Sequence, residues 1–270
     1  MCQCRPVRFL ARKVNKMPLK AALIDLSGTL HVEDDPTPGA VEALERLRKT
    51  NLHIKFVTNT TKESRDTLYQ RLVKIGFKME KSEIFSSLSA AAAYIEDKRL
   101  NPCYLVADDA LKDLPPANPE KFDAVVVGLA PDAFNHERLN VAFNVLLKKH
   151  PLIAIHQGKY YKRKDGLAVG PGFIVKGLEY TASTTATVIG KPTKYFFESA
   201  IPAGVAPEEC VMIGDDAYDD VVGAMNVGMK GILVKTGKYL PSVVVDPPPT
   251  ATLENFSAAV HWIEEELKKN

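Results

Sequence analysis

The sequence predicts an α/β fold, with a Rossmann-like doubly wound parallel sheet and an inserted second α/β domain. The main observation is a set of short apolar runs without polar alternation, which are typical of strands buried on both faces. These runs are 21–24, 54–57, 124–129, 152–155, 211–213 and 232–234. Helical patterns lie between several of them, and strands that alternate with helices form parallel sheets.

Three segments predict helices from the spacing of their apolar residues. The pattern at 38–49 begins with Pro38, which suits an early helical position. The pattern at 64–75 is followed by Gly76, which suits a helix end. The longest pattern, at 252–268, predicts an amphipathic terminal helix with Leu253, Phe256, Val260, Ile263 and Leu267 on one face.

The middle of the chain differs from its two ends. It holds two of the strand-like runs and then a polar, glycine-rich stretch from Gly158 to Gly172. We therefore expect a core formed by 20–87 and 185–270, with an inserted domain at 88–184. Residues 1–19 are expected to form a basic tail, because no acidic residue precedes Asp25. Such a stretch also suits a mitochondrial transit peptide, so a mitochondrial location is the alternative to a cytoplasmic one.

Composition excludes several classes of function. The net charge of +2 gives the whole chain no strong electrostatic basis for binding nucleic acid or an anionic membrane. No apolar run approaches the roughly 18 residues that a membrane helix needs. The four cysteines show no zinc-binding spacing and are expected to be reduced thiols; they are Cys2, Cys4, Cys103 and Cys210.

Asp25 is the first candidate for chemistry, in the segment Asp-Leu-Ser-Gly-Thr-Leu directly after a buried strand. An aspartate at the C-terminal end of a parallel strand lies where α/β sheets place their ligands. Gly28 allows a sharp turn and a close approach of the main chain to an anion. The plainer interpretation is that Asp25 caps a turn.

Two further segments follow strand-like runs. Thr58 and Asn59 offer a hydroxyl and main-chain N–H groups for phosphate oxygens, although for this segment alone an ordinary helix N-cap before Ser64 is the favoured interpretation. Lys191, between Gly190 and Pro192, suits a fixed positive charge that neutralises a carboxylate and a phosphoryl group together. A solvated surface lysine is the alternative there.

The most distinctive segment is acidic and follows the run at 211–213. Its four carboxylates lie within six residues and repel one another unless a cation is present: Asp215, Asp216, Asp219 and Asp220. Mg²⁺ prefers such hard oxygen ligands. A solvated acidic loop is the alternative, but the buried strand before it disfavours that interpretation.

Together and in this order, the four segments resemble the haloacid dehalogenase superfamily of phosphatases, from about Lys20 onward. The chain looks similar to the branch with a large α/β cap inserted between the second and third segments. Three longer stretches also carry this resemblance: Phe-Val-Thr-Asn-Thr-Thr-Lys-Glu-Ser, Tyr-Tyr-Lys-Arg-Lys-Asp-Gly-Leu-Ala and Ile-Leu-Val-Lys-Thr-Gly-Lys-Tyr.

The resemblance implies a Mg²⁺-dependent phosphatase in which Asp25 attacks phosphorus and forms an aspartyl-phosphate, while Lys191 offsets the charge. The implied substrate-binding residues are Asp25, Leu26, Ser27, Thr58, Asn59 and Lys191. The implied Mg²⁺ ligands are Asp25, Ser27 through its main-chain carbonyl, Asp215 and Asp220, with Asp216 or Asp219 as further support. The implied partner is a small phosphorylated substrate or phosphoamino acid, and a homodimer is one candidate assembly, since caps of this kind often lie near dimer contacts.

Ser27 departs from the family pattern. Most phosphatases of this superfamily have an aspartate there, which protonates the leaving group and then activates water, and such catalysis is worth about 10²–10⁴-fold in rate. A serine hydroxyl is not acidic enough to replace it near pH 7. We therefore expect substrates with good leaving groups, namely pyrophosphate, phosphoramidates such as phosphohistidine or phospholysine, and aryl phosphates. The alternative is a catalytically weak or inactive regulatory protein of the same fold.

The basic, aromatic stretch 160–165 is a candidate specificity element of the cap, in which Lys162 or Arg163 approaches an anionic substrate. A solvated hairpin is the alternative. Other nucleotide-binding classes are disfavoured, because the first strand is not followed by G-x-G-x-x-G and the chain lacks G-x-x-x-x-G-K-[ST].

Overall fold

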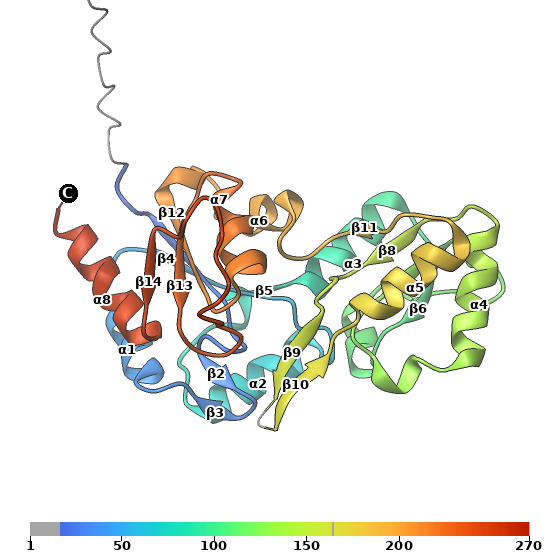
Figure 1. Cartoon of the computed structure of the whole chain (residues 1–270), viewed down its shortest axis with the longest axis horizontal. Helices are drawn as coiled ribbons and strands as arrows, with labels where there is room; N and C mark the ends of the chain where they lie inside the picture. The colour runs from blue at the N-terminus through green and yellow to red at the C-terminus, as the bar shows by residue number, and fades with distance from the viewer. Residues whose placement is uncertain (1–16, 164, 270) are drawn as a thin grey trace, which may run out of the picture.

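The computed structural model describes residues 17–163 and 165–269 and places most of their strands in two parallel sheets (Figure 1). Residues 1–16 of the expected basic tail, with Cys2 and Cys4, lie outside the described residues, as does Lys164. Among the described residues, no helix combines the length and the hydropathy that crossing a membrane requires.

The first sheet has six parallel strands in the order β14-β13-β12-β1-β4-β5. Their bounds are β1 Ala21–Ile24, β4 His53–Thr58, β5 Ile84–Ser86, β12 Cys210–Gly214, β13 Lys230–Val234 and β14 Ala251–Leu253. Four of these strands coincide with apolar runs that predict buried strands, so this part of the expectation is confirmed. The central strands are buried on both faces because helices cover both.

Alternate residues of these strands enter two different hydrophobic clusters. Ala22, Ile24 and Phe56 pack on one face against α1 (Ala40–Leu47), α2 (Arg65–Ile75) and α8 (Phe256–Leu267). Ala21 and Leu23 face the other way, toward α3 (Ser87–Lys98), α6 (Lys194–Ala200) and α7 (Gly223–Met225). The expected doubly wound α/β core is therefore confirmed.

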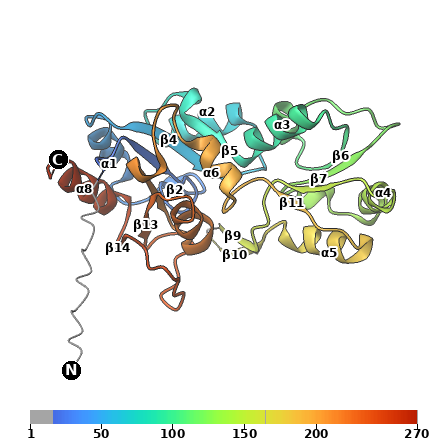
Figure 2. The ribbon, with the colours of Figure 1, turned by 90° about the horizontal axis from the view of Figure 1, so that it is seen from above.

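The second sheet has four parallel strands in the order β11-β8-β7-β6. They are β6 Pro102–Leu105, β7 Ala124–Val127, β8 Leu152–Ala154 and β11 Thr187–Val188. One face packs against α4 (His136–Leu147) and α5 (Gly172–Ala182). The opposite face joins the hydrophobic cluster of α3 and α6, so one cluster extends from the first sheet into the second. The two helices lie where the two sheets meet (Figure 2).

Two antiparallel hairpins complete the strands: β2 (His31–Val32) with β3 (Asp35–Pro36), and β9 (Tyr160–Arg163) with β10 (Gly166–Val169). The β9–β10 hairpin leaves the second sheet and lies between the two sheets (Figure 1). It corresponds to the basic, aromatic stretch of the sequence.

Two elements differ from expectation. The terminal helix begins at Phe256 rather than near 252, because Asn255 caps it by accepting a hydrogen bond from the Ala258 N–H at 3.0 Å. Leu253 instead pairs with Val234 and extends the first sheet. In addition, β11 pairs with β8 in the second sheet, although the predicted core segment 185–270 contains it. The domain boundaries themselves remain a prediction.

Candidate active site

Three of the four segments predicted to carry chemistry meet at one edge of the first sheet. Strand β1 lies between β12 and β4, and the three are parallel. Asp25 follows β1, Thr58 ends β4, and Asp215 follows β12. The strand order reverses at β1, because β4 and β5 lie on one side of it and β12, β13 and β14 on the other. Open α/β sheets bind ligands at such a switch point. Lys191 joins the group from the segment after β11.

Asp25 and Lys191 form a buried ion pair that includes Asp220. The Lys191 ammonium donates to Asp25 Oδ1 and to Asp220 Oδ1, both at 2.6 Å, and Lys191 is only 3% exposed. Burial alone would lower the pKa of Lys191, but the carboxylates of Asp220 and Asp25 outweigh it and raise that pKa. The lysine is therefore a fixed positive charge between two carboxylates.

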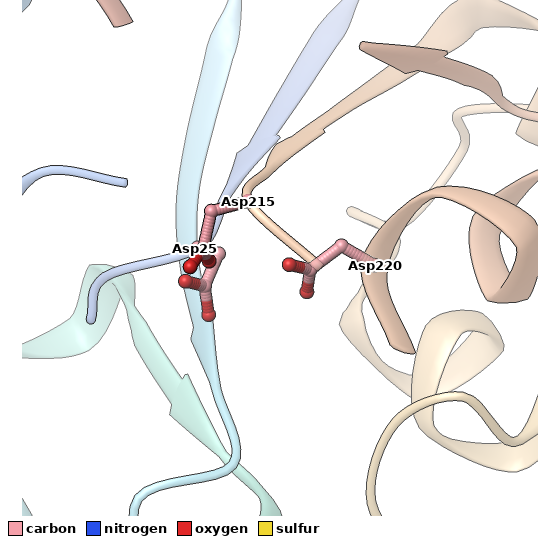
Figure 3. A group of neighbouring side chains, drawn as sticks. All are labelled: Asp25, Asp215 and Asp220. Carbon is pink, nitrogen blue, oxygen red and sulfur yellow. The ribbon is translucent and has the colours of Figure 1, made fainter. Parts of the chain in front are cut away.

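Asp215 lies beside Asp25, and carboxylate oxygens of Asp25, Asp215 and Asp220 all fall within 4.8 Å of one another (Figure 3). Burial, and then the Asp25 charge, raise the pKa of Asp215 well above its ordinary value. Burial also raises the pKa of Asp220 to about 7, although Lys191 opposes this. Crowded, buried carboxylates of this kind fit a divalent cation, because its charge would favour their ionised form.

Gly28 permits this crowding. A Cβ at Gly28 would lie 2.1 Å from Asp215 Oδ2, and its φ of +96° belongs to the left-handed region. A larger residue is therefore excluded both by contact and by backbone conformation. Gly28, in the first segment, thus leaves room for the Asp215 carboxylate, which follows another strand.

Not every predicted site residue presents its side chain to this group. Leu26 is fully buried in the core, so only its main chain is available to a ligand. Both polar atoms of the Asn59 side chain contact the main chain of Lys191, at 3.0 and 3.1 Å. The Thr58 hydroxyl accepts from the Thr60 N–H at 3.1 Å and lies on the cavity wall. Ser27 is exposed on that wall.

The carboxylates of the acidic segment have different partners. Asp220 Oδ2 accepts from the Asp216 N–H at 3.1 Å, while its other oxygen binds Lys191. Asp216 Oδ1 caps residues 217–222, and its Oδ2 lies 3.3 Å from the Lys238 ammonium. Asp220 and Asp216 are therefore held by protein partners through both carboxylate oxygens. Asp25 and Asp215 each have one short contact, and their other oxygens accept only the longer hydrogen bonds of the Thr29 hydroxyl, at 3.3 and 3.4 Å.

The group opens into a cavity of about 500 Å³ between the first sheet and the β9–β10 hairpin. We call Asp25, Lys191, Asp215 and Asp220 the floor of this cavity, since all four are buried. We call Lys62, Tyr161 and Arg163 its rim. The Lys62 ammonium donates to the Tyr161 hydroxyl at 3.1 Å and lies 4.4 Å from the centre of the Tyr161 ring.

Three residues that the sequence did not single out also belong to the site. The Lys238 N–H donates to Asp215 Oδ2 at 2.6 Å. His156 lies 3.4 Å from the Thr61 hydroxyl, and Thr61 also accepts from the Leu129 N–H at 2.8 Å. Burial, then Lys238 and Lys191, lower the pKa of His156 to about 3, so the ring is neutral. His156 directly follows the apolar run at 152–155. The signal that indicated the other site residues could therefore have identified it.

Comparison with known proteins agrees with this arrangement. The family model described as haloacid dehalogenase-like hydrolase matches residues 22–115, and a second, described as HAD-hydrolase-like, matches 188–259. The human haloacid dehalogenase-like hydrolase domain-containing protein 2 is 55% identical over 252 residues, covering 92% of this chain and 97% of that protein. The zebrafish (Danio rerio) phospholysine phosphohistidine inorganic pyrophosphate phosphatase is 37% identical, with 91% and 94% covered.

Among solved structures, the 4-nitrophenylphosphatase from Thermotoga maritima superposes with a TM-score of 0.84 and 24% identity, over 90% of this chain and 97% of that one. This likeness shows a shared fold. The similarity to the curated relatives goes further, because it is high and spans nearly their whole length. The chain belongs to the haloacid dehalogenase-like hydrolases, and the hydrolase class expected from the sequence is confirmed.

Proposed function

We propose that this hydrolase is a Mg²⁺-dependent phosphatase in which Asp25 is the nucleophile and an aspartyl-phosphate is the intermediate. The observation that carries the proposal is the buried carboxylate of Asp25 at the end of β1, paired with Lys191 at 2.6 Å and adjacent to Asp215. A carboxylate is a suitable nucleophile when a fixed positive charge orients it and receives the charge of the transferred group.

The residues of the floor would divide two tasks. Asp25, Asp215 and the main-chain carbonyl of Ser27 would hold Mg²⁺, which when bound stabilises the negative charge on the phosphoryl oxygens. Asp220 is proposed chiefly to fix Lys191, since one of its oxygens contacts that ammonium at 2.6 Å. Thr58 would contact a phosphoryl oxygen, and Asn59 would act through its hold on the main chain of Lys191.

In the proposed reaction, a carboxylate oxygen of Asp25 forms a bond to phosphorus while the bond from phosphorus to the leaving group breaks. The leaving group keeps the electron pair of that bond. Water then attacks the aspartyl-phosphate, which releases phosphate and restores Asp25. The ammonium of Lys191 stays next to Asp25 throughout, because the carboxylate of Asp220 holds it from the other side.

Ser27 supports a narrower range of substrates. Its exposed side chain stands in the cavity wall but offers no acid to protonate a leaving group. We therefore infer that pyrophosphate, phosphoramidates and aryl phosphates are hydrolysed in preference to alkyl phosphates. The name of one relative, a phospholysine phosphohistidine inorganic pyrophosphate phosphatase, agrees with this inference.

The test is phosphate release from pyrophosphate, an aryl phosphate and phosphohistidine, with and without Mg²⁺, beside the variant Asp25→Asn. We expect metal-dependent release from the unaltered protein and a loss of about 10⁴-fold or more in the variant, as for removal of other nucleophiles. If none of the three substrates releases phosphate while Mg²⁺ still binds, Ser27 instead marks a regulatory protein that keeps the fold without turnover.

A further inference from the structure

The cations that line the cavity differ in their partners. Four of them have a carboxylate partner in the described part of the chain: Arg71 pairs with Glu63, Arg163 with Asp165, Lys191 with Asp25 and Asp220, and Lys238 with Asp216. Lys62 is the exception among these described side chains, because its ammonium contacts the neutral hydroxyl and ring of Tyr161. Its positive charge is positioned but not compensated.

The main chain on both sides of Lys62 is fixed. Thr61 is 1% exposed, and its hydroxyl contacts Leu129 and His156 of the second sheet. Ser64 caps α2 and donates its N–H to Asp109 at 2.8 Å. The Lys62 side chain therefore starts from a rigid loop and ends on an aromatic side chain of the β9–β10 hairpin. This is a more defined position than a surface lysine normally has.

The direction of the reaction places the leaving group near this lysine. In phosphoryl transfer the attacking and leaving atoms lie roughly in line on opposite sides of phosphorus. Asp25 attacks from the buried floor, so the leaving group points toward the exposed rim. Lys62 lies at that rim, four residues beyond Thr58.

We propose that Lys62, held in place by Tyr161, binds a negatively charged group on the leaving-group half of the substrate. The preferred substrates then carry a second anionic group, of which the second phosphate of pyrophosphate is the simplest example. This inference rests on the proposed phosphatase function and adds a specificity-determining residue to it. The phenyl half of phenyl phosphate carries no second anionic group, so its binding gains nothing from Lys62.

The experiment compares Lys62→Met and Lys62→Arg with the unaltered protein on pyrophosphate and phenyl phosphate. Lys62→Met is expected to lower kcat/KM for pyrophosphate about 10-fold or more, as for loss of a hydrogen bond to a charged group, and to change phenyl phosphate less than about twofold. Lys62→Arg keeps the charge and should retain most of the pyrophosphate activity. Lys74→Met, an exposed lysine on α2 away from the cavity, is the matched control.

A second readout separates this inference from the proposed function. With Asp25 intact and Mg²⁺ present, calorimetry measures the Kd of methylenediphosphonate, a non-hydrolysable analogue of pyrophosphate, and of inorganic phosphate with and without Lys62→Met. We expect only the Kd of the pyrophosphate analogue to rise, by about the same factor. Equal losses for both ligands, no loss for either, or no binding of either would overturn the role of Lys62. Absence of turnover with the expected change in Kd would overturn the phosphatase alone.

Discussion

The floor and the rim of the cavity both use charged side chains, but they hold them differently. On the floor, Lys191 is buried between the carboxylates of Asp25 and Asp220, both at 2.6 Å, so its positive charge is held against negative charges. On the rim, Lys62 is exposed and rests on the neutral Tyr161. A compensated, buried group suits a reaction common to all substrates, whereas an uncompensated group at the surface suits the recognition of one class of substrate.

The largest effect that would test this contrast is the loss of the floor lysine. Lys191→Met leaves Asp25 and Asp220 buried without their cation, which should lower the free energy of unfolding by about 3–5 kcal/mol. It should also reduce kcat about 10²–10³-fold, because a fixed charge for the transferred group is lost. Urea unfolding and phosphate release measure the two effects.

Lys62→Met provides the comparison for stability. Because Lys62 is exposed, its removal should change the free energy of unfolding by less than about 0.5 kcal/mol. Similar losses of stability in the two variants would contradict the distinction between floor and rim.

The second test places a carboxylic acid at position 27. Ser27→Asp should raise kcat for an alkyl phosphate about 10²-fold, since a carboxylic acid there can protonate a poor leaving group. Aryl phosphate, whose leaving group needs little help, should change much less. Ser27→Asn has a similar shape without the acid and is the control. If steady-state rates on alkyl phosphate do not rise in Ser27→Asp, the lack of an acid does not limit the enzyme.

The third test concerns His156, which links the second sheet to the loop between floor and rim. Burial and two lysines lower its pKa in the folded protein to about 3 from an ordinary 6.5. Below pH 6.5 His156 therefore binds a proton in the unfolded chain, whereas in the folded protein it stays neutral down to about pH 3. The free energy of unfolding consequently falls as the pH falls through this range. The contribution of this histidine is about 1.4 kcal/mol per pH unit between the two values.

In His156→Asn the amide oxygen can still accept from the Gly158 N–H, which donates to the ring at 3.2 Å. The variant should show a shallower decrease of unfolding free energy between about pH 6 and pH 5, within the upper part of the titration window. His53→Asn, at the exposed start of β4, serves as the control. Equal slopes in the variant and the unaltered protein would show that another group determines the acid sensitivity.

The smallest effect sharpens the description of the rim. Tyr161→Phe removes the hydroxyl that accepts from Lys62 but keeps the ring beneath it, so kcat/KM for pyrophosphate should fall only about threefold. Tyr161→Leu also removes the ring and should cost more. Tyr180→Phe, on the outer side of α5, should have no effect. Identical kinetics for the two Tyr161 variants and the unaltered protein would mean that Tyr161 does not position Lys62.

The floor residues were predicted from the sequence because they follow apolar strands, and the structure brings them together, while their catalytic roles stay a prediction. A residue just after a parallel strand must lie at one edge of the sheet, so Asp25, Thr58 and Asp215 meet once β1, β4 and β12 are neighbours. Lys191 was predicted from its place between glycine and proline, although the strand before it belongs to the second sheet. Its contact with Asp25 depends on how the two sheets pack, which periodicity does not report.

The rim and the links between the sheets could not be predicted in the same way. The contact between Lys62 and Tyr161 joins residues 99 positions apart, one on a loop and the other on a hairpin. The contact of the Asn59 side chain with the main chain of Lys191, 132 positions away, could not be predicted either, and a role of Asn59 toward phosphate stays a prediction. The start of the last helix was misplaced because the capping signal of Asn255 was outweighed by apolar spacing.

The hydrophobic cluster that runs through α3 and α6 has a consequence for how relatives of this protein can exchange parts. It contains Leu23 and Met212 from the first sheet together with Val126 and Ile153 from the second. A cut at 88 and 184 would divide this single interior, so a transplanted second sheet would need a matching surface from its new host. The β9–β10 hairpin contributes to none of the buried clusters of the described residues. Exchange of that hairpin, which carries Tyr161 and Arg163, would therefore leave the interior intact.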